Sequence, residues 1–253
     1  MVAEMITLDG YPLTGRTREG EWKRLGELEG WFDSPEPKRD RNDRVNGDGT
    51  IDTEIYFESR LITFNGRVRS KSHDYLHEAA LRLTALPGRG GKKLLVRGHG
   101  PTQWARVDPR GKVKTNFDTD NYLSFQIPLE STDPFKYGEV RSFQTAAGDS
   151  IELFHRGTVH AWPVITITGS MPGGYELTLN GRVVTVTKSL ASGSTHTLDM
   201  RTGILRENGD RVYKGIEIAE YFAVNPGEQQ NFWPNPLAGG SGTFNISLYD
   251  TFI

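Results

Sequence analysis

The sequence predicts a mainly β protein with one helix, arranged as two domains. The chain has 29 glycines, 13 prolines and 10% aromatic residues in 253 positions, a composition typical of short strands joined by many turns. Only residues 72–86 carry a clear helical repeat of apolar side chains. A chain of this length suffices for one large β domain or for two of about 100–150 residues, and we expect two.

Composition argues against several classes of protein. The formal net charge of −2 provides no concentrated basic excess of the kind that binds phosphate backbones, so no nucleic-acid binding is expected. No apolar run approaches the roughly 20 residues of a membrane-spanning helix, which predicts a soluble chain. The absence of cysteine excludes disulfides and thiolate zinc sites. Residues 1–5 lack the basic start of a secretion signal, so none is expected.

The chain opens with short strands. Residues 5–8, the turn at Asp9-Gly10 and residues 11–13 predict a hairpin. Residues 22–32 are interpreted as a short strand pair that glycines interrupt.

A long strand region follows a loop. Residues 34–49, rich in Arg, Asp and turn formers, predict an exposed irregular loop. Residues 54–68 predict two strands or one long bent strand, with a strong turn signal at Asn65-Gly66.

The acidic residues of the loop invite a calcium hypothesis, which the spacing rejects. A calcium-binding loop with Gly49 at its sixth position would begin at Arg44, and one with Gly47 at its sixth would place Arg44 at a ligating position. The loop is therefore interpreted as a solvated segment in which Arg and Asp offset each other. The acids and amides concerned are Asp40, Asn42, Asp43, Asn46, Asp48 and Asp52.

Residues 72–86 predict an amphipathic helix that covers a sheet. Ser72 can cap the first turn, and Pro87-Gly88 ends the helix. The apolar stripe consists of Leu76, Ala79, Ala80, Leu83 and Leu86. His73 and His77 have the spacing of two zinc ligands in a metalloprotease helix. Because Asp74 stands where that motif needs Glu, and no third ligand is evident, both histidines are assigned to the helix surface and no metal is expected.

The rest of the first domain is predicted as strands. Residues 93–97 and 102–107 predict a hairpin, followed by a reversal at 108–111, and residues 122–129 alternate like a half-buried strand. We expect the boundary at 138, after an Asp-Pro interruption.

Charge density also changes at this boundary. Residues 1–138 carry 22 basic and 21 acidic residues, whereas 139–253 carry 8 and 11. The denser first part suits a surface with many polar contacts.

The second domain, 139–253, is predicted to be a β-sandwich. Eight candidate strands alternate with turns, and Asn180-Gly181 and Asn208-Gly209 are hairpin signals. The candidate strands are 141–146, 150–155, 162–168, 175–179, 182–187, 196–200, 213–218 and 244–249.

Four stretches resemble siphophage distal tail proteins. Residues 157–169 read GTVHAWPVITITG, with DPF upstream at 133–135 and NPG downstream at 225–227. A second match runs from Tyr56 through Arg60 to Gly66, and is similar to the signature of the family's N-terminal belt domain.

The resemblance implies a belt domain over 1–138 and a galectin-like sandwich over 139–253, with a last strand that can return to the first domain. It also favours inter-subunit contacts by Tyr56, Arg60, Thr63, Gly66 and Arg67, although Arg60 can equally be read as a surface charge.

The resemblance further implies a structural virion protein and not an enzyme. Such a protein forms a homo-hexameric ring at the distal end of the tail, between the tail tube and the adsorption apparatus, after synthesis in the host cytoplasm. Its expected partners are the tail tube protein, the tape measure protein and tail-associated hub or baseplate proteins. No cofactor, catalytic residue, nucleic acid or membrane is implied.

Two other classes remain open, a carbohydrate-binding adhesin and, last, a β-sandwich glycosidase. The residues of the galectin sugar site are not found, and Pro234 and Pro236 follow Trp233 where that site would lie. Trp162 and Trp233 are therefore interpreted as core or interface aromatics, and no glycan affinity is expected.

Overall fold

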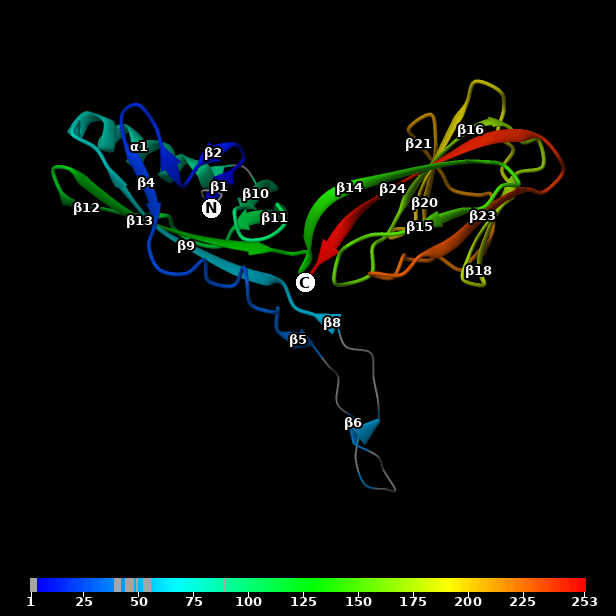
Figure 1. Ribbon diagram of the computed structural model, residues 1–253, viewed down its shortest axis with the longest axis horizontal. Helices are drawn as coiled ribbons and strands as arrows, with labels where there is room; N and C mark the ends of the chain where they lie inside the picture. The colour runs from blue at the N-terminus through cyan, green and yellow to red at the C-terminus, as the bar shows by residue number, and fades with distance from the viewer. Residues whose placement is uncertain (1–3, 39–41, 44–47, 49, 52–55, 89) are drawn as a thin grey trace. The chain divides into compact units, whose positions relative to one another are not determined.

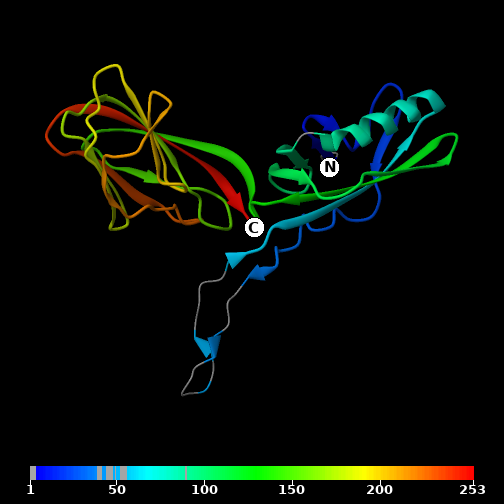
Figure 2. The same ribbon diagram turned by 180° about the vertical axis from the view of Figure 1, so that it is seen from behind.

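A computed structural model describes residues 4–38, 42–43, 48, 50–51, 56–88 and 90–253. The chain divides into two compact units, Met1–Lys136 together with Ile253, and Tyr137–Phe252. Both units are built from antiparallel strands, and α1 (His73–Ala85) is the one α-helix of the described residues. Figures 1 and 2 show the two units from opposite sides.

The first unit is organised around two long paired strands. Strand β9 (Arg60–Arg69) pairs along its whole length with β13 (Tyr122–Ser131). On its other side β9 pairs with β4 (Glu21–Arg24), which pairs with β3 (Gly15–Arg16). The free side of β13 pairs with β12 (Lys114–Thr119) and then with the end of β11 (Gln103–Pro109).

A second group of strands completes this unit. Strand β10 (Lys92–Arg97) pairs with β11 and with β1 (Met5–Leu8), and β1 forms the predicted hairpin with β2 (Tyr11–Pro12). Both residues of its turn have positive φ, 53° for Asp9 and 81° for Gly10. Local turn chemistry therefore specifies this hairpin, as the sequence predicts.

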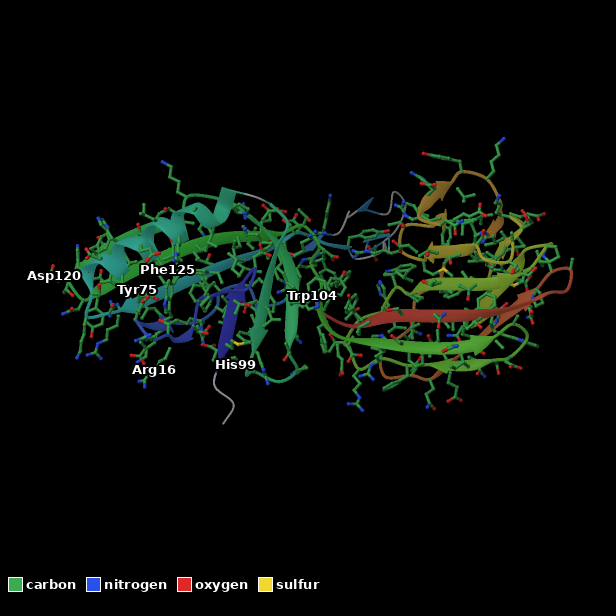
Figure 3. The ribbon with its side chains drawn as sticks, turned by 90° about the horizontal axis from the view of Figure 1, so that it is seen from above. Arg16, Tyr75, His99, Trp104, Asp120 and Phe125 are labelled. Carbon is green, nitrogen blue, oxygen red and sulfur yellow. The ribbon has the colours of Figure 1, made fainter. Side chains whose placement is uncertain are left out.

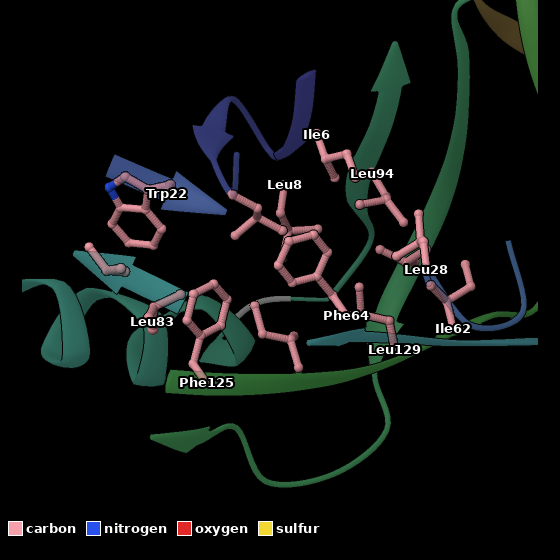
Figure 4. Close-up of a cluster of buried hydrophobic side chains, with 14 of the residues drawn as sticks. Ile6, Leu8, Trp22, Leu28, Ile62, Phe64, Leu83, Leu94, Phe125 and Leu129 are labelled. Atoms are coloured by element: carbon pink, nitrogen blue, oxygen red, sulfur yellow. The ribbon is translucent and has the colours of Figure 1, made fainter. Parts of the chain in front are cut away.

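The core of the first unit lies between α1 and the β9–β13 sheet (Figure 4). Ser72 caps the helix by accepting a hydrogen bond from the Tyr75 amide, and Leu76, Ala79, Ala80 and Leu83 are buried. Alternate residues of the sheet face them, among them Phe64 on β9 and Phe125 on β13, whose rings stack with centroids 5.7 Å apart. The predicted helix and its role as the cover of a sheet are confirmed.

Two predicted turns of this unit are wrong. Asn65 and Gly66 lie within β9, opposite Gln126 and Phe125, because Gly66 serves packing and not chain reversal. A Cβ at Gly66 would lie 2.4 Å from Cζ of Phe125, so only glycine lets the two aromatic rings of the core approach the strand. The reversal predicted at 108–111 begins later, because Asp108 and Pro109 still pair with β13.

Two short strands lie in the segment predicted as an irregular loop, 34–49, and each pairs with a strand that follows this segment. Strand β5 (Pro37–Lys38) pairs with β8 (Tyr56–Phe57), and β6 (Asn42–Asp43) pairs with β7 (Thr50–Ile51). Both pairs are antiparallel. The calcium hypothesis concerns residues that lie largely outside the described part of the chain.

The second unit is a sandwich of two sheets. One has the order β21-β20-β19-β16-β24-β14 and the other the order β15-β23-β17-β18-β22. The first consists of β14 (Lys136–Ala146), β16 (Val164–Ser170), β19 (Thr195–Asp199), β20 (Ile204–Glu207), β21 (Asp210–Val212) and β24 (Ser241–Phe252). The second consists of β15 (Ile151–Leu153), β17 (Tyr175–Leu179), β18 (Arg182–Val186), β22 (Ile216–Ala219) and β23 (Gln230–Pro236).

Most predicted strands of the second unit are present, and both Asn-Gly turns are confirmed. Asn180 and Asn208 have φ of 50°, and the glycine after each also has positive φ. Strands β20, β21 and β23 were not predicted. Strand β23 contains Pro234 and Pro236, which argue against a strand inside a sheet. The carbonyl oxygen and the nitrogen of one strand residue face the same side. The Pro234 carbonyl accepts a hydrogen bond from the Gly148 amide, beyond the end of β15, so the nitrogen of Pro234 also faces a side where no strand requires an N–H donor.

Candidate assembly surface

The residues that the resemblance implies in contacts between subunits lie on two opposite faces of strand β9 and on the neighbouring strand β8. Thr63 and Arg67 point away from the core, whereas Arg60 and Gly66 belong to the buried face. Tyr56 lies on β8 before this strand and is 62% exposed. The strand period of two therefore separates Thr63 and Arg67 on the surface of β9 from Arg60 and Gly66 on its buried face.

Arg60 is not a surface charge, because its side chain is only 2% exposed. Its guanidinium donates to backbone carbonyl oxygens that come before and after it in the chain. Nε lies 3.0 Å from the oxygen of Pro134, and Nη1 lies 2.7 Å from that of Gly30 and 2.6 Å from that of Asp33. Arg60 therefore ties the segment before β5 to the segment after β13.

A second cation, Lys136, occupies the same carbonyl cluster. Its Nζ donates to the Trp31 oxygen at 2.9 Å and lies 5.7 Å from the centre of the Trp31 ring. Burial, with a smaller contribution from nearby Arg60, lowers the pKa of Lys136 to about 8. Nothing in the sequence around Lys136 indicates this position, because Trp31 is 105 residues away.

The outward face of β9 and β13 is polar and already ordered by its own contacts. Arg67 donates from Nε to Ser124 Oγ at 3.2 Å and forms an ion pair with Asp118 on β12, with 3.3 Å between Nη2 and Oδ2. The Arg67 guanidinium also lies 5.6 Å from the centre of the Tyr122 ring. Side chains held in this way lose little further freedom when another molecule covers them.

Further along the open face of β9 and β13, the hydrogen bonds are made by amide side chains. Gln126 donates to Asn65 at 3.0 Å, and Asn65 donates to Glu29 at 3.4 Å. From Arg67 to Asn65 the open side of the sheet thus carries paired polar groups, and beyond them lie Thr63, opposite Pro128, and the exposed Leu61. The opposite side of the sheet is the hydrophobic core under α1.

A recess of about 690 Å³ lies at the N-terminal end of α1 and is lined mainly by charged and hydroxyl side chains. Arg16 and Tyr75 on its wall are labelled in Figure 3. Tyr75 accepts a hydrogen bond from the Trp22 indole, so this wall is a packed part of the unit. Basic residues of the lining are accompanied by Glu19, Glu21, Asp74 and Glu78, which gives the recess no single charge preference.

The helix histidines are exposed, as the sequence predicts. The His73 and His77 rings lie 5.7 Å apart, and both pack against Phe117 of β12. No group of three or more His, Asp or Glu side chains within the described residues is arranged to hold a metal ion. Within the same residues, no helix has the length and apolar character to cross a membrane.

The two tryptophans singled out in the second unit have different environments. Trp162 is partly buried and packs against the sandwich core. Trp233 points outward from β23 and is 51% exposed, which excludes the core alternative and leaves the interface alternative for this residue. Its indole nitrogen donates to the Gly148 oxygen at 3.0 Å.

Comparison with known proteins finds similarity in structure and none in sequence. No model of a known protein family and no curated protein sequence matches the chain. Its structure is similar to that of the Dit protein (gp 19.1) of phage SPP1, described as a paradigm of the hub adsorption apparatus in phages that infect Gram-positive bacteria. The TM-score is 0.74 at 15% identity, over 99% of this chain and 100% of that one.

A second similar structure is the baseplate of phage P2 in its activated conformation with calcium. Its matched chain gives a TM-score of 0.53 at 8% identity, over 97% of this chain and 98% of that one. The likeness to distal tail proteins that the sequence motifs indicate is therefore confirmed at the level of the fold, and this chain has the fold of a siphophage distal tail hub protein.

Proposed function

We propose that this chain is a structural protein of a phage tail tip, which forms a hexameric ring joining the tail tube to the adsorption apparatus. The observation that carries the proposal is the agreement in fold with the SPP1 Dit hub protein along both chains in full. A β-sandwich alone hosts many unrelated functions. A match that includes the helix-covered sheet of the first unit as well is more specific.

The open face of β9 and β13 is the surface we assign to contacts within the ring. It is polar, contains paired charges, and its side chains are ordered before any contact forms. Thr63 and Arg67 lie on this face. The rims of protein interfaces have this composition, and the order lowers the entropic cost of association.

The proposed partners follow from the position of such a ring. They are six copies of this chain, the tail tube and tape measure proteins on one side, and hub or baseplate proteins on the other. In this proposal the chain performs no chemistry, and it is located in the virion at the distal end of the tail.

Particle averaging of assembled tails is the direct test, supported by mass photometry of the purified chain. Six copies related by a six-fold axis at the tail tip are expected. Absence from the tip, or presence there without six-fold symmetry, contradicts the proposal. A monomer in isolation is compatible with it only if tails contain six copies.

A surface variant tests the assigned face. Arg67→Glu places a carboxylate beside Asp118 and should reduce ring or tail assembly while the chain still folds. Arg211→Glu, an exposed site on the second unit, is the matched control and should assemble normally. Arg60→Glu is less suitable, because it would set a carboxylate against the carbonyl oxygens that Arg60 binds and disrupt the first unit itself.

The alternative function is that of a carbohydrate-binding adhesin. One specific observation favours it, the exposure of Trp233 on the outer face of the second sandwich sheet.

A further inference from the structure

Trp233 presents a purely apolar ring surface to its surroundings. About half of the residue is exposed, and its one polar atom, Nε1, is already bonded to the Gly148 oxygen. A ligand that covers this ring therefore does not need to satisfy the indole N–H. The same hydrogen bond fixes the ring, because Gly148 is itself held in place. The Gly148 backbone N–H donates a hydrogen bond to the Pro234 carbonyl oxygen at 2.7 Å.

Two pairs of an acid and an amide flank this ring on the same face of the sheet. Along β23, Asn231 and Asn235 lie two residues before and after Trp233, so all three point to the same side. Asn231 is the cross-strand partner of Glu152 on β15, and Asn235 is that of Glu176 on β17. Each pair sets a carboxylate acceptor beside an amide donor.

The hydrogen-bonding capacity of these pairs is unused. None of the four side chains makes a hydrogen bond or ion pair with the described residues of the chain. They are exposed or half-buried, and so is Thr178, the cross-strand partner of Trp233. An aromatic ring with polar groups on either side that lack hydrogen-bond partners is typical of a binding site, in which such groups fix the orientation of the ligand through hydrogen bonds.

The strands beneath this face are rigid. Phe232 and Leu177, on the opposite side of β23 and β17, are fully buried in the sandwich core. The prolines at 234 and 236 restrict the backbone directly after Trp233. The polar groups are therefore held in place before any ligand arrives.

We propose that this face of the second unit binds a neutral hexopyranose. The C–H face of the sugar ring stacks on Trp233, while neighbouring hydroxyls donate to Glu152 or Glu176 and accept from Asn231 or Asn235. Both charged groups of the site are carboxylates, which disfavours uronic acids and phosphorylated sugars. This reverses the expectation drawn from the missing galectin residues, because the site uses a different residue set on the same kind of sheet.

The polar surroundings distinguish this site from a protein-binding hot spot. Tryptophans at the centre of protein interfaces occupy well-packed, desolvated pockets that exclude water. Around Trp233 the neighbours on the same face are two carboxylates, two amides and a hydroxyl, which suit the hydroxyl-rich edge of a sugar.

The test uses the full chain and needs no assembled ring, so its result is independent of the hub proposal. Cellohexaose, chitohexaose and mannohexaose are titrated into labelled protein, with polygalacturonate as an acidic counterpart, and the indole N–H signals are followed by NMR. We expect saturable binding of at least one neutral oligosaccharide, with a dissociation constant of about 1 mM or tighter, and a shifted Trp233 signal.

Variants separate the site from the rest of the surface. Trp233→Ala should abolish binding, and the pair Glu176→Gln with Asn235→Ala should weaken it about tenfold or more. Tyr213→Ala, which removes the most exposed aromatic residue of the second unit, should leave the affinity unchanged. The proposal fails if no neutral oligosaccharide binds saturably, if Trp233→Ala binds equally well while remaining folded, or if polygalacturonate binds more tightly than the neutral sugars.

Discussion

The two units bury charge in opposite ways. In the first, the two cations Arg60 and Lys136 share a cluster of backbone carbonyl oxygens, and neither forms an ion pair within 4 Å with a described residue. In the second, Arg141 and Asp250 form a paired salt bridge, with Nη2 and Oδ2 2.9 Å apart. The Arg156 amide adds a third hydrogen bond to Asp250, at 2.7 Å.

Buried charge is stabilised mainly by carbonyl dipoles in the first case and by a counter-ion in the second, with different consequences for pH. Carbonyl dipoles only partly replace the hydration of Lys136, so burial lowers its pKa to about 8. At Asp250, burial raises the pKa, but the bonds to Arg141 and the Arg156 amide outweigh burial and lower it. Lys136 therefore carries an electrostatic cost near neutral pH, whereas the ionised form of Asp250 is stabilised there.

The buried charges of each unit are stabilised by groups of the same unit, so the second unit should fold without the first. Residues 139–253 expressed alone should therefore unfold cooperatively and give a dispersed proton NMR spectrum. Circular dichroism and NMR test this, with the full chain as the control. A fragment that stays unfolded while the full chain is ordered would contradict the two-domain division.

Removal of the Arg60 side chain should have the largest effect on stability of these substitutions. Arg60→Ala leaves the carbonyl oxygens of Gly30, Asp33 and Pro134 buried without their donor, so we expect a loss of about 3–5 kcal/mol of unfolding free energy in the first unit. Urea unfolding followed by NMR signals of each unit measures it. Arg67→Ala, on the outer face of the same strand, is the control and should cost under about 1 kcal/mol. Equal losses in the two variants would show that the hydrogen bonds of Arg60 to the carbonyl oxygens add no stability.

Lys136 should make the stability of the first unit rise in alkaline solution. Its pKa is about 8 when folded and 10.5 when unfolded, so between these values the unfolded chain binds more protons. The unfolding free energy should therefore increase from pH 8 to 10.5, by up to about 3 kcal/mol. Lys136→Met should remove the increase that the wild-type chain shows. The same pH profile in both proteins would mean that Lys136 is not the group responsible.

Asp250 should give the second unit the opposite pH dependence, with a smaller effect. Because folding lowers its pKa, its contribution is present above the unfolded value of about 3.9 and is lost as the pH falls through the folded value. Asp250→Asn should cost about 2 kcal/mol at pH 7 and flatten the acid limb of the stability curve. Asp210→Asn, at an exposed position, is the control. If the unfolding free energies of both variants fall with decreasing pH as steeply as that of the wild-type chain, the Arg141–Asp250 salt bridge is not the cause of the pH dependence.

Much of the fold follows from local sequence. The helix is specified by its Ser72 cap and one apolar stripe, and the hairpins at Asp9, Asn180 and Asn208 by residues that adopt positive φ at low cost. Strand β13 alternates buried and half-buried residues along its whole length, which the sequence shows directly. These signals lie within a few residues of one another, so they are legible in the sequence.

The remaining features depended on partners distant in the chain. Gly66 continues a strand because Phe125 packs over it, and β23 accepts Pro234 because no ladder partner faces the missing N–H. The carbonyl cluster around Arg60 and Lys136, and the exposure of Trp233 between two acid–amide pairs, arise only when separate strands meet. Strands, turns and helix can be predicted from the sequence because the preferences that produce them are local. Which charged and aromatic side chains are buried, and which remain available, cannot be predicted in this way, because burial depends on what distant parts of the chain place against them.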